Sequence, residues 1–312
     1  MSSAVLLINP VLPALDRQLS SLYTVHRYYQ HADKPGFLRE VGAQIDGVVT
    51  GGASGISNDV MDALPALKIV AINGIGTDAV DLKYARERRL HVSTTPGVLT
   101  DDVADLAIGL LLSVCRGLCS GDRYVRDGQW GHSALPLARK FSGMRVGIVG
   151  LGRVGRGIAT RAAAFGCIIS YTDLRAFDDV PYCFVADLRQ LAGASDALIL
   201  AASADEAEGI IDAEVLDALG PDGYLINVAR GKLVNEADLV AALAEKRIAG
   251  AGLDVFVDEP NVPAELLPMS NVVLQPHRAS ATVQTREAMG AIVLASLAAS
   301  FAGLRPETSV TP

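Results

Sequence analysis

Short apolar runs and helix-compatible stretches alternate along the first hundred residues. The apolar runs occupy residues 4–8, 47–50 and 67–72. Such short, uninterrupted runs are typical of parallel strands, because helices cover both faces of a parallel sheet. The pattern therefore predicts a parallel α/β layer at the start of the chain.

A long helix is predicted over residues 102–118, where apolar side chains recur at helical spacing. These are Val103, Leu106, Ala107, Leu110, Leu111 and Val114. Thr100 and Asp101 precede the run and are candidate N-caps. The following segment, 121–143, contains several Gly and Arg residues and no sustained periodicity, so we expect it to be irregular.

From Arg145 onward, apolar strands and helical connections alternate again. The expected strands cover residues 146–149, 168–172, 197–201, 224–228, 250–255 and 272–274. Six strands with helical connections predict a doubly wound parallel sheet. The last helical stretch, 279–301, adds no strand and is expected to pack on the N-terminal layer.

The fold class predicted is therefore α/β, with two Rossmann-like domains. A length of 312 residues exceeds the usual size of one hydrophobic core, although a single large α/β barrel also has this length. We expect a discontinuous domain of residues 1–99 plus 282–312, and a second domain of residues 100–281.

Charge and composition exclude several classes of function. The formal net charge of −8 argues against a large nucleic-acid interface, which requires clustered Lys and Arg. The longest apolar runs are far shorter than the roughly 20 residues that cross a bilayer. The N-terminus also lacks the pattern of a secretory signal, so we expect a cytoplasmic protein with no membrane or nucleic-acid partner.

The four cysteines show neither C-x-x-C spacing nor the density of a disulfide scaffold, so we expect them to be reduced and to bind no metal. Cys115 and Cys119 stand one helical turn apart and have the spacing to hold a metal or react with a thiol reagent. Because both belong to an apolar helical segment, the favoured interpretation is that they are buried core residues.

The most specific local motif is G-x-G-x-x-G, which directly follows the strand expected at 146–149. It comprises Gly150, Leu151, Gly152, Arg153, Val154 and Gly155. Gly150 permits a tight turn, Gly152 lets the backbone approach a pyrophosphate, and Gly155 lets the helix pack closely against the strand. The N–H groups of Arg153 and Val154 would face the phosphates at the positive end of the helix dipole. A purely structural glycine turn is the alternative.

Asp173 ends the next expected strand, 18 residues after Gly155, where a carboxylate can accept hydrogen bonds from an adenosine ribose. A carboxylate there repels the 2′-phosphate of NADP and favours NAD(H). Arg175, two residues further on, can reach such a phosphate or can be an ordinary surface charge, so NADP(H) stays possible.

Three polar residues follow expected strands of the same sheet: Arg230, Glu259 and His277. Reduction of a keto acid by hydride produces an alkoxide, so the site needs a proton donor, a group that holds the donor and a cation for the substrate carboxylate. His277, Glu259 and Arg230 have the chemistry for these roles, in that order. Each residue alone has an ordinary structural explanation, but ligands bind at the carboxyl ends of such strands.

A series of motifs resembles the D-2-hydroxyacid dehydrogenase family over nearly the whole chain. The motifs are Asn73-Gly-Ile-Gly-Thr-Asp78, the run from Thr95 to Leu106, the glycine turn, Ile226-Asn-Val-Ala-Arg-Gly231, Gly252-Leu-Asp-Val-Phe256 with Glu259-Pro260, and Pro276-His277. The resemblance implies two α/β domains with the active site in the cleft between them, and a homodimer with segment 121–143 as its arm.

The resemblance also implies roles for single residues. His277 would be the general acid, Glu259 its partner, and Arg230 the anchor for the carboxylate and the carbonyl. Backbone groups of Ile75 and Gly76 would meet the substrate carboxylate, while Val228 and Asp254 would contact the cofactor, Asp254 near the nicotinamide carboxamide.

Within the family, the chain looks most similar to the glyoxylate, hydroxypyruvate and hydroxyphenylpyruvate reductases. The expected function is reduction of a small 2-keto acid to the D-2-hydroxy acid. Residues 201–205 lack the Pro and Thr that usually line the adenine side. The alternatives are a non-catalytic NAD(H)-sensing protein of the corepressor type, or a phosphoglycerate, formate or phosphite dehydrogenase.

Overall fold

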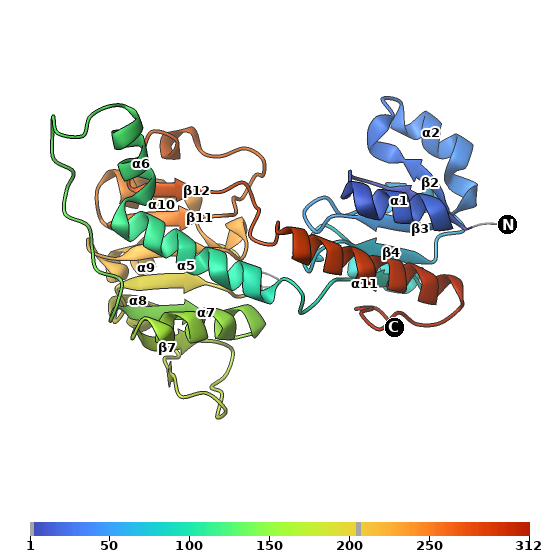
Figure 1. The fold of residues 1–312 in the computed structure, drawn as a ribbon. Helices are drawn as coiled ribbons and strands as arrows, with labels where there is room; N and C mark the ends of the chain where they lie inside the picture. Colours follow the sequence, from blue (N-terminus) through green and yellow to red (C-terminus); the bar gives the residue numbers. More distant parts are fainter. Residues whose placement is uncertain (1–2, 204–206) are drawn as a thin grey trace. The chain divides into compact units, whose positions relative to one another are not determined.

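The computed structural model describes residues 3–203 and 207–312, so part of the segment expected at the adenine side lies outside the described residues. The chain divides into two compact units (Figure 1). Unit 1 comprises Met1–Leu99 and Ala281–Pro312, and unit 2 comprises Thr100–Ser280. Each unit contains a parallel sheet covered by helices, which confirms the predicted α/β class with two parallel sheets.

The sheet of unit 1 has five parallel strands within the described residues, in the order β2-β1-β3-β4-β5. The strands are β1 (Ala4–Leu7), β2 (Thr24–Arg27), β3 (Ile45–Thr50), β4 (Ile69–Ile72) and β5 (His91–Ser93). The predicted runs correspond to β1, β3 and β4. The sequence did not indicate β2 and β5, because both lie at edges of the sheet and carry polar residues.

Helices cover both faces of this sheet. They are α1 (Pro13–Leu22), α2 (Lys34–Val41), α3 (Asn58–Asp62), α4 (Leu82–Glu87) and α11 (Val283–Phe301), with short 3-10 turns at η1 (Tyr28–Gln30) and η2 (Gly42–Gln44). On one face Val5, Leu7 and Val49 pack against Leu297 of α11 and Leu19 of α1. The final helix thus returns to the first sheet, as its position in the sequence predicted.

The C-terminal residues extend the edge of this sheet at β5. Ser309 pairs with Ser93 in an antiparallel bridge. The buried Thr311 hydroxyl accepts the Val92 N–H and donates to the Leu90 carbonyl, both at 2.8 Å. These bonds satisfy backbone groups that an uncovered edge strand would expose.

In the described part of unit 2, seven parallel strands form the order β12-β11-β10-β9-β6-β7-β8. They are β6 (Arg145–Val149), β7 (Ile168–Thr172), β8 (Cys183–Phe184), β9 (Ala197–Leu200), β10 (Tyr224–Asn227), β11 (Gly250–Leu253) and β12 (Val272–Leu274). The six predicted strands are all present. The sequence did not reveal β8, which is only two residues long.

Helices also cover both faces of the second sheet. They are α5 (Thr100–Arg116), α7 (Arg153–Ala164), α8 (Leu188–Gly193), α9 (Ala213–Leu219) and α10 (Glu236–Ala244), with 3-10 turns η3 (Gly231–Leu233) and η4 (Ala264–Leu266). Helix α5 packs closely on β11, because a Cβ at Gly252 would lie 2.9 Å from Leu110 Cβ. Glycine in β11 is therefore a requirement of helix packing.

The helix predicted over 102–118 begins and ends earlier than expected. Helix α5 already includes Thr100 and Asp101, and Gly117 takes a left-handed φ of +61° that turns the chain into α6 (Leu118–Arg126). The prediction that the chain is irregular from residue 121 is therefore wrong up to Arg126. Cys115 is buried as predicted, but Cys119 is exposed, because it lies beyond the break.

Among the described residues, no single helix is long and apolar enough to cross a membrane. Helices α5 and α6 reach that length and composition only together, and they are bent by 59° at their junction.

Candidate active site

The candidate site residues of unit 2 lie along one edge of its sheet. Arg230, Glu259 and His277 follow β10, β11 and β12, which are adjacent strands. The carboxyl ends of parallel strands meet at one edge, where open α/β sheets bind ligands. The glycine turn follows β6 at the same edge, and β9 separates it from β10.

His277 and Glu259 form the central contact of this edge. His277 Nδ1 lies 2.6 Å from Glu259 Oε2, and the other carboxylate oxygen accepts the Phe256 N–H at 3.1 Å. A carboxylate at Nδ1 favours the tautomer that carries its proton on that nitrogen. The imidazole is therefore oriented, and its second nitrogen, Nε2, is available for proton transfer.

Asp254 holds the loop that carries His277. Its carboxylate is fully buried and accepts the Arg278 and Ala279 N–H groups at 2.8 and 2.9 Å, while its carbonyl accepts the His277 N–H at 2.8 Å. His277 has a φ of +47°, a left-handed conformation that is unfavourable for residues other than glycine. The three bonds maintain that conformation and thereby place the imidazole.

The turn that carries Arg230 is shaped by its own backbone and by Asn227. The buried Asn227 side chain donates to the Arg230 carbonyl at 2.9 Å and accepts the Ala229 N–H at 3.0 Å. A Cβ at Gly231 would lie 2.0 Å from the carbonyl carbon of Phe256. Glycine at 231 thus allows the Arg230 turn to pack directly against the loop that leads to Glu259.

The carboxylates of this edge differ in their electrostatics. Burial alone would raise the pKa of Glu259, but the His277 hydrogen bond, the Phe256 N–H and the charge of Arg230 outweigh it and lower the pKa. Ionised Glu259 therefore stabilises the folded state above its ordinary pKa, and this contribution is lost as the pH falls through the lowered value. Burial raises the pKa of Asp254, despite its two backbone hydrogen bonds.

The glycine turn has the geometry that its sequence predicted. Gly150 has a φ of +89°, and a Cβ at Gly155 would lie 2.0 Å from the Gly150 carbonyl oxygen. Gly152 is the N-cap residue of α7, and a Cβ added to it would meet nothing within 4 Å. The first-turn N–H groups of Arg153 and Val154 have no intrahelical acceptor, so the turn offers open space and donors to a phosphate.

Asp173 lies directly against this turn. Its two carboxylate oxygens accept the Leu151 and Leu174 N–H groups, both at 2.7 Å. The Arg175 guanidinium lies 5.7 Å from the centre of the Phe177 ring. Asp173, the carboxylate predicted to bind the ribose, therefore lies at the glycine turn, while Arg175 lies over the Phe177 ring.

The remaining predicted residues lie in different environments. Val228 is buried just after β10. Ile75 and Gly76 follow β4 and belong to unit 1, so the structure does not test their predicted contact with the substrate. Within the described residues, no group of three or more His, Cys, Asp or Glu has the arrangement to hold a metal ion.

Asn227 and Gly231 belong to one of the family motifs, but no role was predicted for either residue from the sequence. Asn227 shapes the Arg230 turn, and Gly231 permits its contact with Phe256. A polar residue at the end of an apolar strand was the available signal for Asn227. The positioning role of Asp254 was also missed, because its partners lie 24 and 25 residues further along the chain.

Fold and site together define a dinucleotide-binding α/β protein with a histidine–carboxylate pair beside an arginine. Comparison with known proteins makes this more specific. The family model described as "D-isomer specific 2-hydroxyacid dehydrogenase, NAD binding domain" matches residues 108–279. The chain belongs to the D-isomer specific 2-hydroxyacid dehydrogenase family, which confirms the resemblance found in its motifs.

Individual relatives cover nearly the whole chain. A 2-ketogluconate reductase of Gluconobacter oxydans is 43% identical over 99% of this chain and 97% of its own length. A hydroxyphenylpyruvate reductase of Plectranthus scutellarioides is 45% identical over 96% of each chain. Among solved structures, the NADPH-dependent glyoxylate/hydroxypyruvate reductase of Sinorhizobium meliloti, in complex with NADP and malonate, is 38% identical with a TM-score of 0.91, covering 99% of this chain and 97% of that one.

Two glycine substitutions should separate dinucleotide binding from fold stability. Gly152→Ala adds a methyl group in open space, so we expect an unchanged melting temperature but weaker NADH binding, because the pyrophosphate is kept from the backbone. Gly155→Ala should lower stability by about 1–3 kcal/mol through its clash with Gly150. Thermal unfolding and NADH fluorescence titration measure both effects. Equal NADH affinity in wild type and Gly152→Ala would contradict the assignment.

Asp254→Asn tests the support of the His277 loop. The Asn side-chain NH2 would face one of the two backbone N–H groups that donate to the Asp254 carboxylate, so one hydrogen bond to the His277 loop would be lost. Because His277 would then be less well positioned, we expect kcat to fall by about 100-fold. Asp258→Asn, an exposed carboxylate of the neighbouring loop, is the matched control and should retain activity. An unchanged Kd for NADH in Asp254→Asn would indicate positioning of His277 alone, whereas a raised Kd would support the predicted carboxamide contact. Full turnover of Asp254→Asn would exclude both roles.

Proposed function

We propose that this protein catalyses the NAD(P)H-dependent reduction of a small 2-keto acid to the D-2-hydroxy acid. The observation that carries the proposal is the 2.6 Å contact between His277 Nδ1 and Glu259 Oε2, beside Arg230 at the carboxyl edge of a dinucleotide-binding sheet. Proton donor, charge partner and cation are the groups that reduction of a keto acid requires.

His277 acts as the general acid in this proposal. Its Nε2 gives a proton to the keto oxygen as negative charge develops there, and Glu259 stabilises the imidazolium before the transfer. The side chain of His277 is 39% exposed and that of Glu259 is 25% exposed, so the acid is accessible to a substrate while its partner is more shielded. Arg230 binds the carboxylate and polarises the carbonyl, since guanidinium donors match both acceptors.

The dinucleotide supplies a hydride when it is bound. Gly150, Gly152 and Gly155 form the turn for the pyrophosphate, with donors from Arg153 and Val154. Asp173 accepts hydrogen bonds from the ribose, and Val228 and Asp254 complete the predicted cofactor contacts. We propose a preference for NAD(H), because the Asp173 carboxylate repels a 2′-phosphate, while Arg175 leaves NADP(H) usable.

The substrate class follows from the relatives. Their names specify 2-ketogluconate, hydroxyphenylpyruvate and glyoxylate or hydroxypyruvate, all of which are 2-keto acids or the aldehyde analogue glyoxylate. We propose glyoxylate, hydroxypyruvate and aryl pyruvates as the substrates of this chain, with the backbone of Ile75 and Gly76 meeting the carboxylate. We also propose a cytoplasmic location, which the four free cysteines support.

Activity assays test the proposal directly. Wild-type protein should oxidise NADH in the presence of glyoxylate, hydroxypyruvate or 4-hydroxyphenylpyruvate, faster than it oxidises NADPH. His277→Ala should lose most turnover, by about 10²–10⁴-fold, because the proton donor is removed. Arg230→Ala should raise KM as well as lower kcat. NADH binding without turnover of any keto acid would favour the dinucleotide-sensing alternative, and near-normal activity of both variants would reject the assigned roles.

We further propose that residues 121–143 form the arm of a homodimer. Trp130 and Leu137 in this segment are 78% and 103% exposed, and large apolar side chains that are exposed in a single chain are available to an interface.

Sedimentation velocity tests the arm. Wild type should sediment as a dimer, and Leu137→Asp should shift the equilibrium toward monomer, because a charge would be buried at the interface. Leu174→Asp changes an equally exposed leucine outside the arm and should leave the dimer intact. A monomeric wild type, or a Leu137→Asp dimer as stable as the control, would refute the arm.

A further inference from the structure

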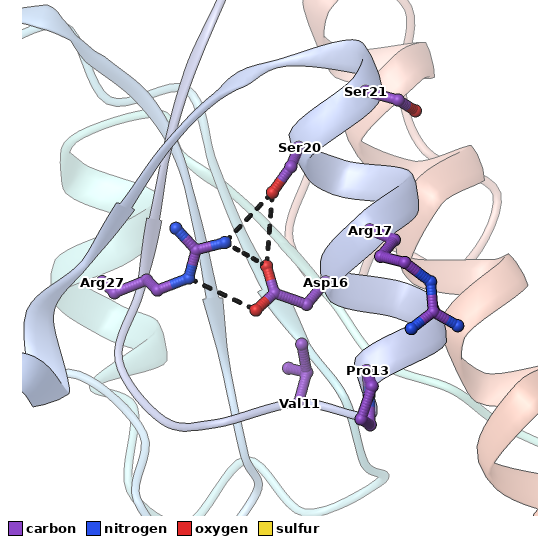
Figure 2. Close-up of a pocket in the computed structure, with 7 residues that line it drawn as sticks. All are labelled: Val11, Pro13, Asp16, Arg17, Ser20, Ser21 and Arg27. Carbon is purple, nitrogen blue, oxygen red and sulfur yellow. Dashed lines mark hydrogen bonds and ion pairs between the residues drawn. The ribbon is translucent and has the colours of Figure 1, made fainter.

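The carboxylates of this chain find hydrogen-bond partners in several ways. In unit 1, Asp16 of α1 pairs with the Arg27 side chain of β2 and accepts the Ser20 hydroxyl (Figure 2). Other carboxylates cap the helix that they precede, as Asp187 does by accepting the Gln190 N–H. Both kinds of contact join segments that are close in the sequence.

A different kind of carboxylate accepts a backbone N–H from a loop that is remote in the sequence. At the carboxyl edge of the unit 2 sheet, Asp173 holds the glycine turn in this way, and Asp254 holds the His277 loop. Glu236 makes a contact of the same kind, because its Oε1 accepts the Val257 N–H at 2.9 Å, 21 residues further along the chain. This contact supports a third loop of the candidate site.

The position of Glu236 is itself well defined. Glu236 is the first residue of α10, and Asn235 caps this helix by accepting the Asp238 N–H at 3.3 Å. The Asn235 N–H donates to the Ile211 carbonyl at 3.0 Å, next to the bridge between Ile211 and Val234. The positive end of the helix dipole also stabilises a carboxylate in the first turn. Glu236 therefore has a fixed base from which it can hold a neighbouring loop.

The Val257 N–H belongs to the loop that carries Glu259. One residue earlier, the Phe256 N–H donates to Glu259 Oε1 at 3.1 Å, so the loop closes on its own carboxylate. The Gly231 backbone packs against the same loop, since a Cβ at Gly231 would lie 2.4 Å from the Val257 nitrogen. Glu236 binds the N–H next to that of Phe256 and thereby limits movement of the group that orients the Glu259 carboxylate.

We propose that Glu236 is a positioning residue for proton transfer: it fixes the loop after β11, and this loop fixes Glu259 against His277 Nδ1. The inference rests on the proposed reductase function. Asp254 and Glu236 then support the two halves of the histidine–carboxylate pair, Asp254 through the loop after β12 and Glu236 through the loop after β11. The contact requires an acceptor oxygen, which an amide side chain also provides.

Steady-state kinetics of glyoxylate reduction test this role in three variants. Glu236→Ala removes the acceptor, so we expect kcat to fall about tenfold while KM changes by less than about twofold, because Arg230 still binds the substrate carboxylate. Glu236→Gln keeps an acceptor and should retain about half or more of the wild-type kcat. Asp238→Ala is the matched control, since this carboxylate of the same helix turn accepts the Ala213 N–H of α9 instead. It should retain the wild-type kcat.

The pH profile separates positioning from a general loss of stability. Ionised Glu259 stabilises the protonated imidazole, so a loosened contact lets the imidazole lose its proton at lower pH. In Glu236→Ala, the fall of kcat/KM at high pH should therefore move to lower pH by about half a pH unit or more. Asp238→Ala should keep the wild-type profile even where its melting temperature falls. The neighbouring charges of Asp254 and Arg230 are present in both variants.

A wild-type kcat and pH profile in Glu236→Ala, or an equal loss of kcat in Asp238→Ala, would overturn the proposal. The nitrogen NMR chemical shifts of the His277 ring give a readout that needs no turnover, because they report its tautomer and its protonation. They should change in Glu236→Ala and stay at the wild-type values in Asp238→Ala. If the wild type reduces no keto acid, the reductase function fails, and unchanged His277 ring shifts in Glu236→Ala would then reject the positioning of Glu259 as well.

Discussion

The buried carboxylate of Asp254 is the constraint on which the geometry of the site depends. A carboxylate with no access to water must find its hydrogen bonds within the protein, and Asp254 finds them in the backbone after β12. Because Arg278 and Ala279 are tied to it, His277 is held in a left-handed conformation that it would otherwise rarely adopt. The contact with Glu259 then follows, since both loops leave adjacent strands.

Glycines complete this arrangement where side chains would keep loops apart. Gly231 lets the Arg230 turn contact Phe256, and Gly155 lets α7 approach the turn at Gly150. Both are close backbone approaches that a Cβ would prevent. The site is thus assembled by backbone contacts between neighbouring loops at one edge of a parallel sheet, and the reactive side chains project from them. This arrangement suits a reaction whose rate depends mainly on how the substrate and the catalytic side chains are oriented.

Much of this was accessible from the sequence. The periodicity predicted all six longer strands of the second sheet, and the glycine turn was recognised with its correct flanking strand and helix. Strands β2, β5 and β8 were not predicted. All three lie at sheet edges; β2 and β5 carry polar residues, and β8 is only two residues long. The break at Gly117 also escaped notice, since apolar spacing continues across it, and the location of Cys119 was wrong for that reason.

What the sequence by itself determined is the local chemistry: strand, turn and helix around Gly150, and the types of residue at positions 230, 259 and 277. These depend on neighbours within a few residues, so pattern and residue type suffice. Only the tertiary structure decided that Nδ1 of His277 meets Glu259 and that Asp254 supports the His277 loop. The burial of a side chain and its hydrogen-bond partners depend on segments that folding brings together from distant parts of the chain, so a local sequence pattern cannot predict them.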